Sequence, residues 1–150
     1  MDQKQVQRGA VKTGMLWGGI GGAVGFVVAL IGGALAGVLI SGFIGFSCGR
    51  RAAAAEAGRK SGALSGLIAG ALATPIFVLG ASAGSAISAR SVSTAEMADM
   101  ISQMAGMEVT PEGAWQLFLV SLVFAAFVQA LILILASSAA GAWALRKKSE

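Results

Sequence analysis

The chain has no histidine, tyrosine or asparagine, and it has a single cysteine, Cys48. Without histidine it lacks the commonest general base and metal ligand, and without asparagine it has no N-glycosylation site. A lone cysteine cannot form an intrachain disulfide. Charge is scarce as well, because only 12% of the residues are charged, against about 25% in soluble domains. We therefore expect no enzymatic activity, no metal site and no cofactor.

Apolar residues are what the chain has in excess. They make up 56% of it and concentrate in three blocks, residues 13–49, 61–89 and 114–145. Each block is longer than the roughly 20 residues that a helix needs to cross the hydrocarbon core of a bilayer. A helix in a soluble core rarely runs this far without a charge. We expect an all-α, multi-pass membrane protein with a single membrane domain over residues 1–150.

The basic residues lie in short clusters beside the apolar blocks. Three Lys or Arg residues precede the first block, four follow it and three follow the last, whereas segment 90–113 has one, Arg90, among four carboxylates. Because cytoplasmic loops carry the excess of Lys and Arg, both termini and segment 50–60 should be cytoplasmic. Such clusters suit anionic lipid headgroups better than nucleic acid. The expected headgroup contacts are Arg50, Arg51, Arg59, Lys60, Arg146, Lys147 and Lys148.

The first block should cross the membrane twice, because the basic segments on either side of it face the same compartment. It can hold two helices of about 17 residues, each roughly 26 Å long, with a tight turn at Gly32-Gly33. A re-entrant segment is the alternative, and a signal peptide cleaved after Ala36 is a weaker rival because the stretch is so rich in glycine. The predicted plan comprises spans at 14–31, 34–49 (with 52–55 as a possible extension), 61–89 and 114–145, a cytoplasmic loop at 50–60 and an outer loop at 90–113.

Small residues recur every four positions in the first three predicted spans, and this spacing places them on one face of each helix. In lipid, where helices gain little from hydrophobic association, small residues let backbones approach closely. We therefore expect a core packed as a glycine zipper, either within one subunit or against a second chain. The last span lacks this pattern and should cover the others or face lipid. The residues are Gly14, Gly18, Gly22, Gly33, Gly37, Ser41, Gly45, Gly49, Gly58, Gly62, Gly66 and Gly70.

Two polar residues stand out inside the predicted spans. Gln129 lies near the middle of the last span, where an amide must find a partner. It either bonds a neighbouring helix or lines a path for a polar solute. Thr74 precedes Pro75, and its hydroxyl can bond back to a carbonyl and moderate the loss of a backbone hydrogen bond at the proline. Trp17, Trp115 and Trp143 mark the membrane interfaces.

The outer loop should contain a short amphipathic helix over residues 94–105. Ser93 and Glu96 have the spacing of a capping box. Met97, Met100, Ile101 and Met104 then follow at helical spacing. This apolar face should lie on the membrane surface or the bundle, or dock a partner.

The second and third predicted spans resemble a known group. Ser41-Gly42-Phe43-Ile44-Gly45, a short loop with Arg50 and Arg51, and the run Gly62 to Gly70 are similar to motifs of small, glycine-rich, four-helix prokaryotic membrane proteins, often archaeal and of unassigned function. Ser41 stands where that group has glycine. The resemblance implies a four-helix fold and no particular activity.

The functional expectation follows from the packing pattern. We expect a non-enzymatic protein of the cell membrane that acts by helix–helix association, either as an accessory subunit or as a homo-oligomeric scaffold. Its partners would be membrane lipids and either itself or other membrane subunits. The alternative is a small oligomeric channel or permease for a neutral or weakly polar solute.

Overall fold

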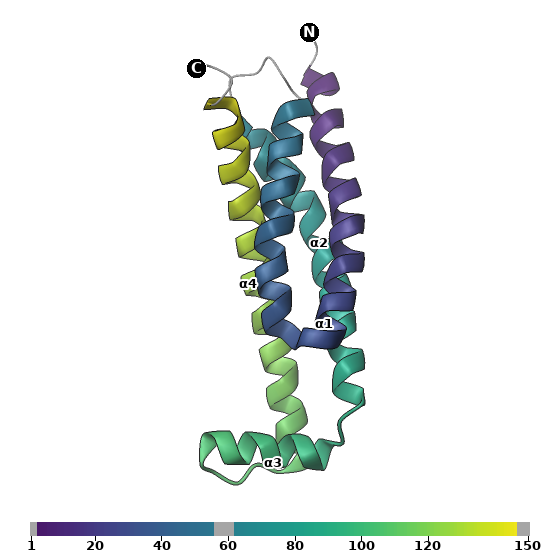
Figure 1. Ribbon diagram of the computed structural model, residues 1–150, viewed down its shortest axis with the longest axis vertical. Helices are drawn as coiled ribbons and strands as arrows, with labels where there is room; N and C mark the ends of the chain where they lie inside the picture. The colour runs from purple at the N-terminus through teal and green to yellow at the C-terminus, as the bar shows by residue number, and fades with distance from the viewer. Residues whose placement is uncertain (1–2, 56–61, 147–150) are drawn as a thin grey trace.

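The computed structural model describes residues 3–55 and 62–146. They form four helices: α1 (Gln3–Ala55), α2 (Gly62–Arg90), α3 (Thr94–Ala105) and α4 (Pro111–Arg146) (Figure 1). The start of α1 and the end of α4 lie at one end of the bundle, which we call the termini end, and α3 lies across the opposite end. The expectation of an all-helical protein is confirmed.

Within the described residues, three helical segments are long and apolar enough to cross a membrane. They are Gly9–Ile31, Gly62–Arg90 and Pro111–Arg146, with 23, 29 and 36 residues. These segments match the first, third and fourth predicted spans in place, and all three begin earlier or end later than predicted. The predicted span 34–49 is not among them.

Helix α1 folds back on itself. If its 53 residues formed a straight helix at about 1.5 Å per residue, it would be roughly 80 Å long. Instead Arg51 Cζ lies 5.6 Å from the centre of the Trp17 ring, and Gly25 and Gly37 both face Ala81 of α2. The chain therefore reverses between Gly25 and Gly37, and we call residues 3–31 the first arm and residues 36–55 the second arm.

The boundaries of α1 correct the predicted loop. Residues 50–55 were assigned to the 50–60 loop, with 52–55 as a possible helical extension, and the helix does continue to Ala55. The physical reason is that Arg51 is followed by an alanine run, and alanine and arginine are among the best helix formers. The backbone also stays helical through Gly32-Gly33, the predicted tight turn.

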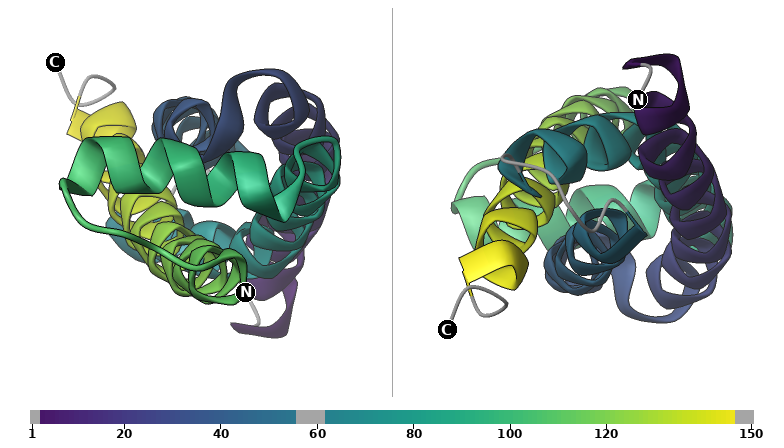
Figure 2. Two further views of the ribbon diagram at one scale, coloured as in Figure 1. Left: turned by 90° about the horizontal axis from the view of Figure 1, so that it is seen from below. Right: turned by 90° about the horizontal axis from the view of Figure 1, so that it is seen from above.

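Close backbone contacts join the arms, α2 and α4 into a ring, seen end-on in Figure 2. A Cβ added at Gly14 of the first arm would lie 2.6 Å from the carbonyl oxygen of Ala69 in α2, and one at Gly45 of the second arm 2.5 Å from that of Leu133 in α4. Helices α2 and α4 meet through Gly62 and Gly141, each of which faces the other's backbone.

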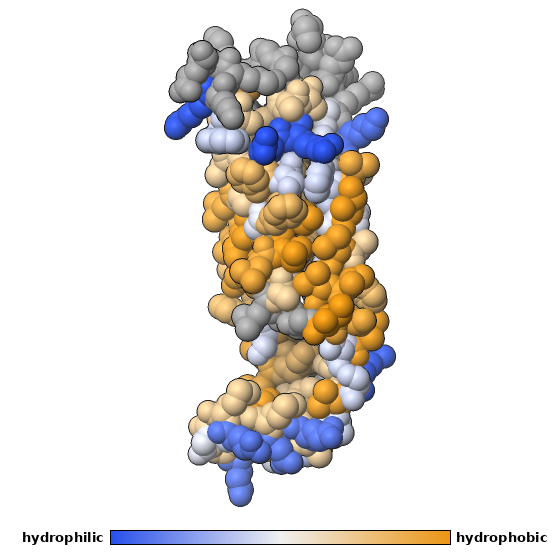
Figure 3. Space-filling model, in the orientation of Figure 1, coloured by the Kyte–Doolittle hydropathy of each residue, from blue (hydrophilic) through white to orange (hydrophobic). Residues whose placement is uncertain are grey.

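The interior is made of small side chains, and the exterior carries many of the large ones. Phe77 and Leu133 are the largest fully buried residues, and alanines supply most of the remaining core. By contrast, Ile31 and Leu39 are 82% and 79% exposed. Figure 3 shows the resulting apolar belt between two hydrophilic ends. This distribution suits a bundle surrounded by lipid.

Helix α3 covers the residues predicted for the amphipathic helix, and its termini explain its limits. Ser93 accepts a hydrogen bond from the backbone N–H of Glu96, while the Glu96 carboxylate accepts one from the backbone N–H of Ser93, at 3.0 Å. The second bond lowers the pKa of Glu96 below its usual value. Gly106, at φ 68°, ends the helix in the left-handed region. Among the described helices, α3 packs against α4 alone.

Candidate functional site

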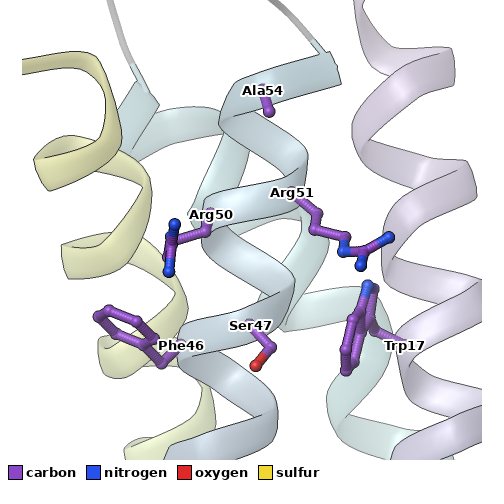
Figure 4. A pocket seen from close by; sticks show the side chains of 6 residues that line it. All are labelled: Trp17, Phe46, Ser47, Arg50, Arg51 and Ala54. Atoms are coloured by element: carbon purple, nitrogen blue, oxygen red, sulfur yellow. The ribbon is translucent and has the colours of Figure 1, made fainter. Parts of the chain in front are cut away.

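A cleft of about 350 Å³ opens between the two arms of α1 near the termini end (Figure 4). On the second arm the lining positions recur every three or four residues, which places them on one helical face. On the side toward the middle of the bundle the arms touch, because Gly21 leaves room for Ile44; a Cβ at Gly21 would lie 2.8 Å from Ile44 Cγ2. The lining residues are Trp17, Phe46, Ser47, Arg50, Arg51 and Ala54.

Arg51 and Trp17 form the contact across the cleft. The guanidinium carbon lies 5.6 Å from the indole ring centre, within the range of a cation–π interaction. The indole nitrogen Nε1 is buried, and it makes no hydrogen bond with any residue that the structure describes. Leaving a buried donor unsatisfied costs about 1–3 kcal/mol. An acceptor bound next to this N–H would therefore be stabilised by a hydrogen bond from it.

Arg50 lies on the side of the second arm that faces α4, where it contacts two aromatic rings. Its guanidinium carbon lies 5.8 Å from the Phe46 ring centre and 5.5 Å from that of Trp143 on α4. The two rings are 6.1 Å apart. Figure 4 shows Arg50 and Arg51 pointing in opposite directions, with Ser47 below them. Neither arginine forms an ion pair with the described part of the chain.

The chemistry of the cleft is that of a cation-lined donor site. The Arg51 guanidinium, one indole N–H and one hydroxyl belong to it, while Arg50 points away toward Phe46 and Trp143. An anion with several acceptor oxygens is therefore the complementary ligand. Within residues 3–55 and 62–146 there is no group of three or more His, Cys, Asp or Glu residues that could hold a metal ion. Among the described residues that line the cleft, none carries a carboxylate or a thiol, and their donors suit binding and orienting an anion.

Gln129 and Thr74, the two predicted intramembrane polar residues, lie away from this cleft. Gln129 is 3% exposed, and its Nε2 atom lies 2.7 Å from where a Cβ on Gly37 would be. The amide is therefore packed against the start of the second arm. Thr74 donates a hydrogen bond of 2.8 Å to the carbonyl oxygen of Gly70, one turn before it, as its position beside Pro75 suggested.

Most of the predicted packing residues face another helix of the same chain. Gly14, Gly18 and Gly22 face α2, Gly45 and Gly49 face α4, and Gly62, Gly66 and Gly70 face α4 from the other side. Gly37 faces Gln129 and Ala81, and Ser41 is fully buried and bonds to the carbonyl of Val38. Gly33 lies in α1 near the reversal. Gly58, Arg59, Lys60, Lys147 and Lys148 lie outside the described residues.

Sequence reasoning missed part of the packing. Gly80 faces the backbone of Gly22, and Gly84 that of Phe26. The expectation that the last helix lacks small packing residues is wrong at Ser137 and Gly141, which meet α2. The sequence did contain a signal for these contacts. Gly80 and Gly84, and likewise Ser137 and Gly141, are four residues apart, which is the spacing of small residues that pack helices in membranes.

The cleft was predicted only in part. Arg50 and Arg51 were expected at headgroups, and Trp17 was noted as an interface marker. Phe46, Ser47 and Ala54 were missed. Their common helical face is visible in the sequence, but their approach to Trp17 depends on how α1 reverses.

Comparisons of this chain with family models, curated proteins and solved structures found no match. The resemblance of residues 41–45 and 62–70 to small, glycine-rich, four-helix prokaryotic membrane proteins, often archaeal, therefore stays a prediction. The functional argument depends on the geometry.

Proposed function

We propose that the protein is a four-span protein of the cell membrane with both termini in the cytoplasm. The second arm supplies the fourth span: residues 36–49 are helical and uncharged, and at about 1.5 Å per residue they extend roughly 21 Å, so the bilayer core of about 30 Å must thin around them. The basic residues of the two arms lie toward the termini end, and α3, which carries Glu96 and Asp99, lies across the other end (Figure 1). The positive-inside rule then assigns the termini end to the cytoplasm.

We further propose that the protein is not an enzyme and acts as an accessory subunit that binds another membrane polypeptide. The observation that carries this proposal is an exposed apolar face on the half of α4 nearest α3. Large apolar side chains there are exposed: Val120 by 67%, Val123 by 70%, Phe124 by 68% and Phe127 by 61%. We call these four residues the α4 outer face.

The length of α4 favours a protein partner at this face over lipid alone. Its 36 residues extend about 54 Å, well beyond a hydrocarbon core of about 30 Å. Trp143, beside Arg50, marks one boundary of that core, so the other falls near Val123. Leu117 and Leu119, which are 48% and 44% exposed, then lie beyond the hydrocarbon core. Exposed apolar side chains outside that core indicate a contact with another protein.

The small residues that recur every four positions support this choice of surface, because they already pack against other helices of the same chain. Gly49 and Gly66 already press on the backbone of Ser137, so they cannot also pack against a second chain. Helix α3 offers a second contact beside the α4 outer face. Its Met100 and Met104 are exposed, and methionine surfaces adapt readily to partners.

Site-specific photo-crosslinking in the host membrane tests the proposal. A photoreactive residue replaces Phe124 on the α4 outer face, and the matched control replaces Leu39, which is exposed on the second arm. We expect the probe at position 124 to form a discrete product with a different polypeptide, and the control to react with lipid. A product of twice the 14.9 kDa chain mass would indicate a homo-oligomeric scaffold instead. Lipid products at both positions would overturn the association.

A further inference from the structure

We propose that the cleft between the two arms of α1 is a binding site for the phosphate group of an anionic phospholipid. This inference is independent of the partner proposed for α4. In the cleft, hydrogen-bond donors outnumber the acceptors that the described residues provide. The Trp17 N–H and the Arg51 guanidinium lie side by side (Figure 4), and the described residues provide no hydrogen-bond acceptor for that N–H.

Phosphate fits this arrangement better than other anions. It presents several acceptor oxygens, so it can take a charge-assisted pair from Arg51 and a further bond from the indole. The Ser47 hydroxyl, also in the cleft, can supply another donor. Arg51 is exposed and its side chain is long, so a change of rotamer opens the indole N–H to the ligand.

The surroundings of the cleft indicate a lipid rather than a soluble phosphate. One helical turn toward the middle of the bundle, the first arm exposes Ile20 by 45% and the second arm exposes Phe43 by 66%. Figure 3 shows the apolar belt on the bundle side of the basic band, a short distance from it. A phosphate in the cleft therefore leaves acyl chains lying along apolar surface, as an anionic headgroup at a membrane interface requires.

Native mass spectrometry of the purified protein in detergent tests this site. Phosphatidylglycerol, phosphatidylcholine and water-soluble glycerol phosphate are added separately, and bound adducts are measured. We expect one phosphatidylglycerol to be retained preferentially over phosphatidylcholine. Arg51→Gln should weaken it about tenfold or more, since a hydrogen bond to a charged group is lost.

Trp17→Phe is the sharper variant, because it keeps an aromatic ring under Arg51 and removes only the N–H. We expect phosphatidylglycerol binding to fall about tenfold or more, because a hydrogen bond to a charged phosphate is lost. Lys12→Gln removes the same charge from an exposed position outside the cleft and should leave binding unchanged, and circular dichroism checks that each variant is folded.

Three results would overturn the proposal. Equal retention of the two lipids would remove the anion preference. An equal loss in Lys12→Gln would indicate general surface charge instead of a built site. Displacement of the lipid by glycerol phosphate at similar concentration would make it a site for soluble phosphate.

Discussion

The hydroxyl of Ser137 in α4 donates a hydrogen bond of 2.7 Å to the carbonyl oxygen of Gly66 in α2. The two residues are fully buried or nearly so, and Gly49 of the second arm approaches the carbonyl of the same serine. Three helices therefore meet at one residue. Small side chains on all three make this approach possible, as expected where helix packing in lipid depends on close contact.

The first prediction concerns this meeting point. A Cβ at Gly66 or Gly49 would clash with the backbone of Ser137, so Gly66→Ala and Gly49→Ala should each destabilise the bundle. Overpacking costs about 1–3 kcal/mol, more than the roughly 1 kcal/mol that alanine gains over glycine within a helix. Thermal unfolding in mild detergent measures the loss.

Gly19→Ala is the matched control for these variants. Nothing lies within 4 Å of a Cβ at Gly19, on the exposed side of the first arm, so this variant should be neutral or slightly stabilised. If all three variants unfolded alike, close packing at Ser137 would not be what holds the helices together.

The second prediction concerns Cys48, which is 0% exposed on the second arm. Its thiol should not react with a membrane-permeant maleimide while the protein is folded, and it should react after denaturation. Ala54→Cys, at an exposed position near the end of the second arm, should be labelled in the folded protein when combined with Cys48→Ser. Rapid labelling of native Cys48 would mean that the second arm does not pack against α4.

The third prediction concerns the start of α3. The pKa of Glu96 is lowered because its carboxylate accepts hydrogen bonds from the backbone and hydroxyl of Ser93. The stabilisation is therefore present above the carboxyl group's usual pKa and is lost as the pH falls through the lowered value. At neutral pH, Glu96→Gln should speed hydrogen exchange in residues 94–98. Asp99→Asn, on the same helix but outside the cap, should not. Equal exchange in both variants would argue against the cap.

The sequence anticipates the elements of this fold better than their pairing. Apolar blocks locate the helical spans, because length and hydropathy are local properties. The glycine spacing shows which face of each helix packs. It does not show that Gly14 meets α2 while Gly45 meets α4, because each choice depends on the positions of all the helices together.

The cleft shows the same limit. Arg50 and Arg51 are conspicuous as a basic pair, and Trp17 as an interfacial aromatic. Their proximity follows from the reversal of α1 within a backbone that stays helical from Gln3 to Ala55. The basic clusters and Gly32-Gly33 predict that the chain reverses, but they do not predict the register in which the two arms align, so residues 34 positions apart cannot be paired from sequence.

The most direct test of the four-span topology is labelling of single cysteines with a membrane-impermeant maleimide in intact cells. In a Cys48→Ser background, Lys12→Cys reports on the first arm, Ala54→Cys on the end of the second, and Gln103→Cys on α3; all three positions are exposed. We predict that only Gln103→Cys is labelled from outside, and that the other two react after the cells are opened. Labelling of residues 12 and 54 from opposite sides would contradict the topology, because the second arm would then not cross the membrane.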